Sequence, residues 1–316
     1  MGDMAYDLCG WHVSSAIPLP DLPVWRGAPG TADVTLVLGD VPELEDRVMT
    51  TPFLQVARDG RMRFVADKVA AYRIENGNRI TIAPQISPEA AEVRLFLLGT
   101  AFGCLCHQRG VVPIHGSTVV IDGTAVVFAG DSGAGKSTLA DGFARRGYPI
   151  LADDVSTLDL SAPRGLVLPN LRRIKLWRDA IDHAGWPQSD LERCREGMEK
   201  FSRALHDAPP GPFPPGALFH LRRHSARQPR AVFRRLRGRA AAQEFERQIY
   251  RGRALGALAG KAGAMARSMR AASVFPHHFI VERAIDFAHF EAVIDDIVNT
   301  VRAAFAGDDG GTDSPR

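Results

Sequence analysis

Nine consecutive residues combine glycines, a lysine and three hydroxyls at a spacing that suits phosphate binding. They match the pattern GxxxxGK[ST] and comprise Gly130, Asp131, Ser132, Gly133, Ala134, Gly135, Lys136, Ser137 and Thr138. Glycines at three of these positions allow backbone N–H groups to turn inward onto phosphate oxygens. Lys136 would then reach the β- and γ-phosphates of a nucleotide, and the Ser137 hydroxyl would bind Mg²⁺.

The flanking residues provide the strand and helix that this pattern requires. Residues 124–129 form an apolar run typical of a buried strand, and residues 139–146 predict a helix that ends at Gly147. The positive end of the helix dipole would face the same place as the backbone N–H groups of the glycines. The sequence therefore predicts a strand, a phosphate-binding loop and a helix in this order.

A pair of acidic residues follows the next predicted strand, residues 148–152. Asp153 and Asp154 are adjacent, so at a strand end their side chains should point to opposite sides. One could hold Mg²⁺ and the other could face an acceptor; we assign the metal to Ser137 and Asp153. His115 precedes the loop by about one hairpin, and both a structural role and a role in the site remain open for it.

Two groups of cations lie further along the chain. Arg172, Arg173 and Lys175 belong to an extended segment that is either a phosphate clamp or a solvated face. Arg235 and Arg239 belong to an arginine cluster, which would either favour an acidic partner or neutralise charge in a transition state. The sequence does not decide between these alternatives.

The composition of the 316 residues is that of an ordinary globular protein, with 45% hydrophobic and 24% charged residues and a net charge of +3. No apolar run approaches the length of a membrane span, and the N-terminus lacks the pattern of a secretory signal. We therefore expect a cytoplasmic protein without a membrane partner. A nucleic-acid partner is not expected either, because the arginines are not interleaved with stacking aromatic residues.

The chain divides into three expected regions. Residues 1–86 predict a small, mainly antiparallel β unit that could dock a substrate, since Asp59-Gly60 and Asn76-Gly77 separate alternating runs. Residues 87–306 predict a nucleotide-binding domain that begins with a linking helix, and residues 307–316 predict a disordered tail. Within the second region we expect helices at 189–206, at about 240–258 and at about 287–306.

The segments Pro113–Ser117, Gly130–Ser137 and Leu151–Asp154 resemble, in order and spacing, the catalytic domain of HPr kinase/phosphorylase. This resemblance covers about residues 100–160. It implies an α/β fold with a P-loop kinase core, ATP and Mg²⁺ as cofactors, and a homo-oligomer. It further implies that Asp153 or Asp154 accepts the proton of an acceptor serine, that His115 lies beside that carboxylate and tunes it, and that Lys136 contributes to catalysis.

Two differences from HPr kinases indicate a substrate other than HPr. The glycine-rich segment that follows the double aspartate in those enzymes is absent, and the N-terminal β unit differs from their N-terminal domain. The chain looks more like the related enzymes of ribosomal peptide pathways, which implies a serine kinase for a peptide or small protein, with the C-terminal serine of a lasso-peptide precursor as the expected acceptor. The alternatives are a kinase for an HPr-type carrier protein and a nucleotide-binding sensor without transfer activity.

Overall fold

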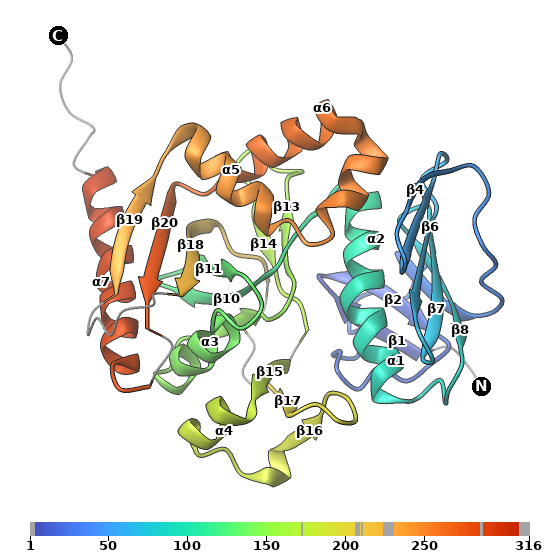
Figure 1. Cartoon of the computed structure of the whole chain (residues 1–316), viewed down its shortest axis with the longest axis horizontal. Coiled ribbons are helices and arrows are strands. Elements are labelled where there is room, and N and C mark those ends of the chain that lie inside the picture. The colour runs from blue at the N-terminus through green and yellow to red at the C-terminus, as the bar shows by residue number, and fades with distance from the viewer. Residues whose placement is uncertain are drawn as a thin grey trace.

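A computed structural model describes residues 4–171, 173–205, 209, 211–223, 231–284 and 287–309. It contains an N-terminal eight-stranded sheet, a central six-stranded sheet and two three-stranded sheets. Helices lie on both faces of the central sheet, and a further helical segment lies along the N-terminal sheet (Figure 1). The predicted α/β class is confirmed.

The N-terminal sheet has the strand order β1-β2-β3-β8-β7-β6-β5-β4. Its strands are β1 (Met4–Leu8), β2 (Trp11–Ser15), β3 (Val34–Leu38), β4 (Arg47–Thr50), β5 (Leu54–Ala57), β6 (Met62–Ala66), β7 (Ala70–Glu75) and β8 (Arg79–Pro84). Both predicted hairpins are present, β5–β6 and β7–β8. In the second, Asn76 and Gly77 both have positive φ angles, which fits the turn that an Asn-Gly pair favours. The pairings are antiparallel except β2–β3 and β3–β8, which are parallel.

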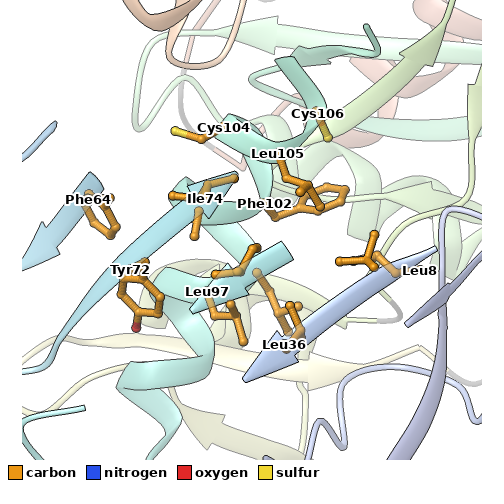
Figure 2. Packing of buried hydrophobic residues seen from close by; sticks show 14 of the residues in the cluster. Leu8, Leu36, Phe64, Tyr72, Ile74, Leu97, Phe102, Cys104, Leu105 and Cys106 are labelled. Carbon is orange, nitrogen blue, oxygen red and sulfur yellow. The ribbon is translucent and has the colours of Figure 1, made fainter. Parts of the chain in front are cut away.

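One long helical segment joins the two main sheets. It consists of α1 (Ala91–Phe96), a π-helical turn η1 (Leu97–Ala101) and α2 (Phe102–Gln108). Figure 2 shows Tyr72 and Ile74 of β7 near Leu97 and Phe102 of this segment, within one buried cluster. The hydroxyl of Tyr72 donates to the carbonyl of Val93 at 2.8 Å. Because this helix packs against the N-terminal sheet, residues 1–86 do not form a core of their own.

The central sheet has the strand order β12-β10-β11-β18-β20-β19. Its strands are β10 (Gly116–Ile121), β11 (Thr124–Gly130), β12 (Ile150–Ala152), β18 (Pro215–Arg223), β19 (Val232–Leu236) and β20 (His277–Arg283). Strands β11, β18 and β20 run parallel. Buried side chains of α3 (Lys136–Arg145) and α7 (Phe290–Asp309) cover one face, and those of α5 (Gly238–Gln248) and α6 (Gly252–Ser273) cover the other.

The two small sheets flank the central one. One contains β9 (Val112–Ile114), β13 (Ser156–Asp159) and β14 (Leu166–Leu168). The other contains β15 (Arg173–Trp177), β16 (Leu191–Arg193) and β17 (Lys200–Ala204), with α4 (Arg178–Ala184) and the 3₁₀ turn η2 (Gln188–Asp190) between its strands.

The helix predicted at 189–206 is wrong, because this stretch contributes η2, β16 and β17 instead. Its apolar residues recur at helical spacing, but β17 pairs along its whole length with β15 and buries Phe201. Tertiary pairing thus overrides the local pattern.

The remaining helices differ from their predicted bounds. The stretch predicted as one helix at about 240–258 is split between α5 and α6, and α6 itself is interrupted at Gly260, where φ is +68°. Helix α7 continues to Asp309, three residues into the predicted tail, and residues 310–316 lie outside the described part of the chain. Within the described residues, no helix is long and apolar enough to span a membrane.

Gly116→Ala is expected to destabilise the fold, because a Cβ atom at position 116 would lie 2.8 Å from the carbonyl oxygen of Phe128 in the neighbouring strand. Overpacking of this kind costs roughly 1–3 kcal/mol of the free energy of unfolding, which urea denaturation measures. Gly256→Ala in α6 is the matched control, since a Cβ there meets nothing within 4 Å. Equal stability of the two variants would contradict the close approach of β10 and β11.

Candidate active site

The glycine pattern forms the connection between β11 and α3, and we call residues 130–135 the glycine loop. The predicted order of strand, loop and helix is confirmed, with Ser137 and Thr138 in the first turn of α3. Gly133 and Gly135 have φ angles of +77° and +84°, in the left-handed region that glycine adopts readily. A Cβ atom at these positions would lie 2.4 Å and 2.2 Å from the guanidinium nitrogens of Arg223 and Arg283. The backbone conformation of the loop therefore favours glycine at both positions, and a larger residue would also displace the two guanidinium groups.

Lys136 lies against the glycine loop. Its Nζ donates to the backbone carbonyls of Gly130 at 2.8 Å and Asp131 at 3.0 Å, and the residue is 7% exposed. Burial lowers the pKa of Lys136, and the attraction of Asp154 and Asp153 opposes this shift only in part. A poorly hydrated cation whose partners are neutral carbonyls favours an anionic ligand at this loop.

The carboxylate of Asp153 joins the loop helix to a neighbouring strand. Its Oδ1 accepts hydrogen bonds from the hydroxyls of Ser117 on β10 at 2.6 Å and Ser137 on α3 at 2.8 Å. Its Oδ2 accepts from the backbone N–H of Lys175 at 2.9 Å. The structure thus brings together Ser137 and Asp153, the residues predicted to bind the metal, at a position where Asp153 is 2% exposed.

These two oxygen donors fit a magnesium ion. Mg²⁺ prefers hard oxygen ligands and is usually bound through one or two carboxylates together with substrate phosphates and water. In the described ranges, no group of three or more His, Cys, Asp or Glu side chains is arranged to hold a metal by itself. A cation at Ser137 and Asp153 would therefore take its remaining ligands from a phosphate and from water.

Asp154 has different partners from Asp153, although the two residues are adjacent. Its φ angle is +70°, which is uncommon for a residue other than glycine. Its Oδ2 accepts a hydrogen bond from Nζ of Lys175 at 2.8 Å. Burial acts to raise the pKa of Asp154, but the attraction of Lys175 and Lys200 outweighs it, and the net shift is downward. Both carboxylates therefore contact Lys175, Asp153 through its backbone N–H and Asp154 through its ammonium group.

His115 contacts the backbone of Asp154. Its Nδ1 donates to the carbonyl of Asp154 at 3.0 Å, so Nε2 carries the lone pair of the neutral ring. Burial, followed by repulsion from Lys136, lowers the pKa of His115. The imidazole is therefore neutral at pH 7 and holds the segment that bears the acidic pair.

Most of the residues predicted as a clamp lie elsewhere. Lys175 reaches the site, but as the partner of Asp154. Arg173 forms ion pairs with Asp21 at 2.6 Å and Glu192 at 2.9 Å. Arg172 lies outside the described residues.

Arg235 and Arg239 belong to β19 and α5. Strand β19 is three strand positions from β11, roughly 14 Å at about 4.8 Å per position. Arg235 also donates to Nδ1 of His277 at 2.8 Å. Neither arginine contacts the glycine loop in the part of the chain that the structure describes.

Two other arginines contact the glycine loop, and the sequence analysis missed both. Arg223 donates to the carbonyl of Gly133 at 2.8 Å, and Arg283 donates to that of Ala134 at 3.1 Å. They end β18 and β20, which run parallel to β11, so the carboxyl ends of all three strands meet at the loop. Each of these arginines is the last residue of a strand that runs parallel to β11. Their position at strand ends could have indicated them, had those strands been predicted to be parallel to β11.

The fold and the site define an α/β protein in which a glycine loop, a buried lysine and an acidic pair meet at one edge of the central sheet. No family model matches the chain, and no curated protein matches it. The chain is similar to the solved structure of the Hpr(Ser) kinase/phosphatase from Coxiella burnetii, with 15% identity and a TM-score of 0.35 over 63% of this chain and 94% of that one. A likeness at this level assigns neither a family nor a function to the chain.

Asp154→Asn is expected to destabilise the protein at neutral pH by roughly 2–3 kcal/mol, because it leaves the buried ammonium of Lys175 without its partner. The pKa of Asp154 is depressed in the folded state, so its contribution is complete above the unfolded pKa of about 3.9 and is lost as the pH falls below that value. Urea denaturation of both proteins between pH 7 and pH 3 measures this. A difference in stability that stays constant over the whole range would contradict the ion pair.

Proposed function

We propose that this chain is an ATP- and Mg²⁺-dependent serine kinase that acts on a peptide or small protein. The observation that carries the proposal is the carboxylate of Asp153, which is hydrogen-bonded to Ser137 on the loop helix and lies next to a second carboxylate, Asp154. Simple binding of a nucleotide does not require the second carboxylate. Bound ATP would supply the phosphoryl group that is transferred.

The residues of the glycine loop and its surroundings would hold and orient the nucleotide. Backbone N–H groups of the loop and of the first turn of α3 would bind the phosphates, and Lys136 would add a positive charge there. Ser137 and Asp153 would ligate the magnesium ion. Arg223 and Arg283 would add positive charge beside the loop, where it stabilises charge that develops during phosphoryl transfer.

Asp154 would orient the acceptor hydroxyl and take its proton. The transition state of phosphoryl transfer is loose, so a carboxylate of low basicity suffices and orientation contributes more than basicity. Lys175 would keep Asp154 ionised, and His115 would fix its backbone. In this scheme His115 and Lys175 are positioning residues, and Asp154 is the catalytic base.

We propose as acceptor the C-terminal serine of a ribosomally made precursor peptide of the lasso type. This step rests on the resemblance to HPr-kinase-related enzymes of peptide pathways and on the two departures from HPr kinases. An HPr-type carrier protein is the alternative acceptor.

Transfer of label from γ-labelled ATP to a precursor peptide that ends in serine tests the function directly. We expect labelling of the serine peptide, no labelling of the same peptide ending in alanine, and no labelling of HPr, with mass spectrometry as the readout. If only HPr were labelled, the proposed acceptor would be wrong, but the proposed kinase activity would be supported. ATP binding without transfer to any of these acceptors would contradict the kinase proposal.

A nucleotide sensor without transfer activity is the second candidate, and one observation favours it. The ion pair between Asp154 and Lys175 already occupies one carboxylate oxygen of the proposed base. A sensor would bind ATP and ADP with different affinities and change its association with a partner, which calorimetry and sedimentation of the full chain would detect.

A further inference from the structure

Two grooves flank the glycine loop, and their linings differ in chemistry. The first, which we call the aromatic groove, has a volume of about 550 Å³ and is lined by Ser132, Gly133, Trp177, Arg178, Glu199 and Arg223, among others. The second, which we call the arginine groove, has a volume of about 650 Å³ and includes Arg222, Arg223, Glu244, Arg247 and Gln248. Both volumes lie in the range of small-molecule sites.

Trp177 gives the aromatic groove an exposed indole ring beside the loop. The residue ends β15 and is 43% exposed. It lies two residues after Lys175, so both side chains leave the same face of the strand, and that of Lys175 reaches Asp154. The side chain of Trp177 is therefore on the face of β15 that borders the site.

Lys200 connects the indole ring to the charged centre. It is paired with Trp177 across β15 and β17, and its Nζ lies 5.7 Å from the centre of the indole ring. The same ammonium group acts electrostatically on Lys136 and Asp154. The groove that contains Trp177 also includes Ser132 and Gly133, so it borders the glycine loop directly.

The arginine groove borders the other side of the site. Gln248, which lines it, accepts a hydrogen bond at its carbonyl from the backbone N–H of His115 at 2.7 Å. His115 in turn donates to the carbonyl of Asp154. Backbone hydrogen bonds therefore link the lining of this groove, through His115, to the segment that carries the proposed base.

The geometry points to Trp177 as the stacking platform for the nucleobase of the bound nucleotide, with the arginine groove left for the acceptor. This inference rests on the proposed function. A nucleobase presents a flat π face, and stacking on an aromatic side chain is sequence-tolerant and contributes substantially to the binding of nucleotides. The side chains of the arginine groove suit polar or anionic groups better than an apolar ring face.

The test compares the binding of ATP with that of inorganic tripolyphosphate, which has the phosphates but no base. Calorimetry on the full chain measures both affinities for the wild type, Trp177→Ala and Trp177→Phe. We expect Trp177→Ala to weaken ATP binding at least fivefold, in line with the loss of one base stack. Tripolyphosphate binding should change less than twofold, and Trp177→Phe should retain most of the affinity for ATP.

Trp25→Ala is the matched control, because Trp25 stacks on His12 in the N-terminal region and should affect neither ligand. Equal weakening of ATP and tripolyphosphate by Trp177→Ala would overturn the inference, as would unchanged ATP binding together with a raised KM for the acceptor peptide. If the wild type binds ATP no more tightly than tripolyphosphate, the nucleobase contributes nothing to affinity. The proposed role of Trp177 is then wrong, but the phosphate-binding role of the glycine loop is supported. If the wild type binds neither ligand, the proposed function fails and the inference fails with it.

Discussion

Asp153→Asn is expected to reduce phosphoryl transfer by about 10²–10³-fold or more, which is the usual effect of removing one group that organises charge in a transition state. Both oxygens of this carboxylate accept hydrogen bonds, from two hydroxyls and one backbone N–H. An asparagine amide can accept through only one oxygen, and its NH₂ group faces a donor on the other side. The variant also loses the anionic ligand proposed for Mg²⁺.

Two measurements separate this loss from unfolding or from loss of the nucleotide. Asp153→Asn should still bind ATP in EDTA, but adding Mg²⁺ should no longer tighten binding as it does for the wild type. Asp182→Asn on α4 is the matched control, since Asp182 is exposed and its ion pair with Arg178 is long, at 3.9 Å. If Asp153→Asn turned over like the wild type, the proposed role of Asp153 as a metal ligand would be wrong. If Asp154→Asn did so, the proposed role of Asp154 as the base would be wrong.

The central part of the site follows from local sequence. The glycine loop, the strand before it and the helix after it lie within about 25 consecutive residues, so their pattern and turn chemistry specify them directly. The acidic pair was predictable for the same reason, because it follows directly after the next strand, β12. The different contacts of Asp153 and Asp154 do not follow from strand alternation, because β12 ends at Ala152 and Asp154 has a φ angle of +70°.

The parts that the sequence analysis missed depend on contacts between distant segments. Arg223 and Arg283 reach the loop only because β18 and β20 pair in parallel with β11, and no local pattern fixes that order. For Lys175 the sequence left open a phosphate clamp or a solvated face. The residue instead pairs with Asp154, since β15 lies against the acidic pair. Local periodicity also produced the wrong helix at 189–206, where strand pairing determines the structure.

The N-terminal region is connected to the site through one buried carboxylate. Asp21, in the proline-containing segment after β2, pairs with Arg173 of β15 and with Arg94 of α1. Strand β15 also carries Lys175 and Trp177, the partner of Asp154 and the proposed platform.

Lys136→Met is expected to abolish transfer, with a loss of about 10³-fold or more, and to weaken ATP binding, because it removes the buried positive charge of the glycine loop. The free energy of unfolding should stay the same or rise. Burial already lowers the pKa of Lys136, and a methionine of similar length removes the cost of a buried charge. Loss of activity with unchanged or higher stability is the signature of a charge kept for function.

Denaturation in urea and single-turnover transfer on the same samples test both parts of this prediction. Lys261→Met on α6 is the matched control, because that lysine is exposed and remote from the glycine loop in sequence. A variant that keeps transfer within tenfold of the wild type would contradict the phosphate-binding role of Lys136. A variant that loses transfer and several kcal/mol of stability together would instead identify Lys136 as a structural residue, whose hydrogen bonds to Gly130 and Asp131 serve to hold the loop.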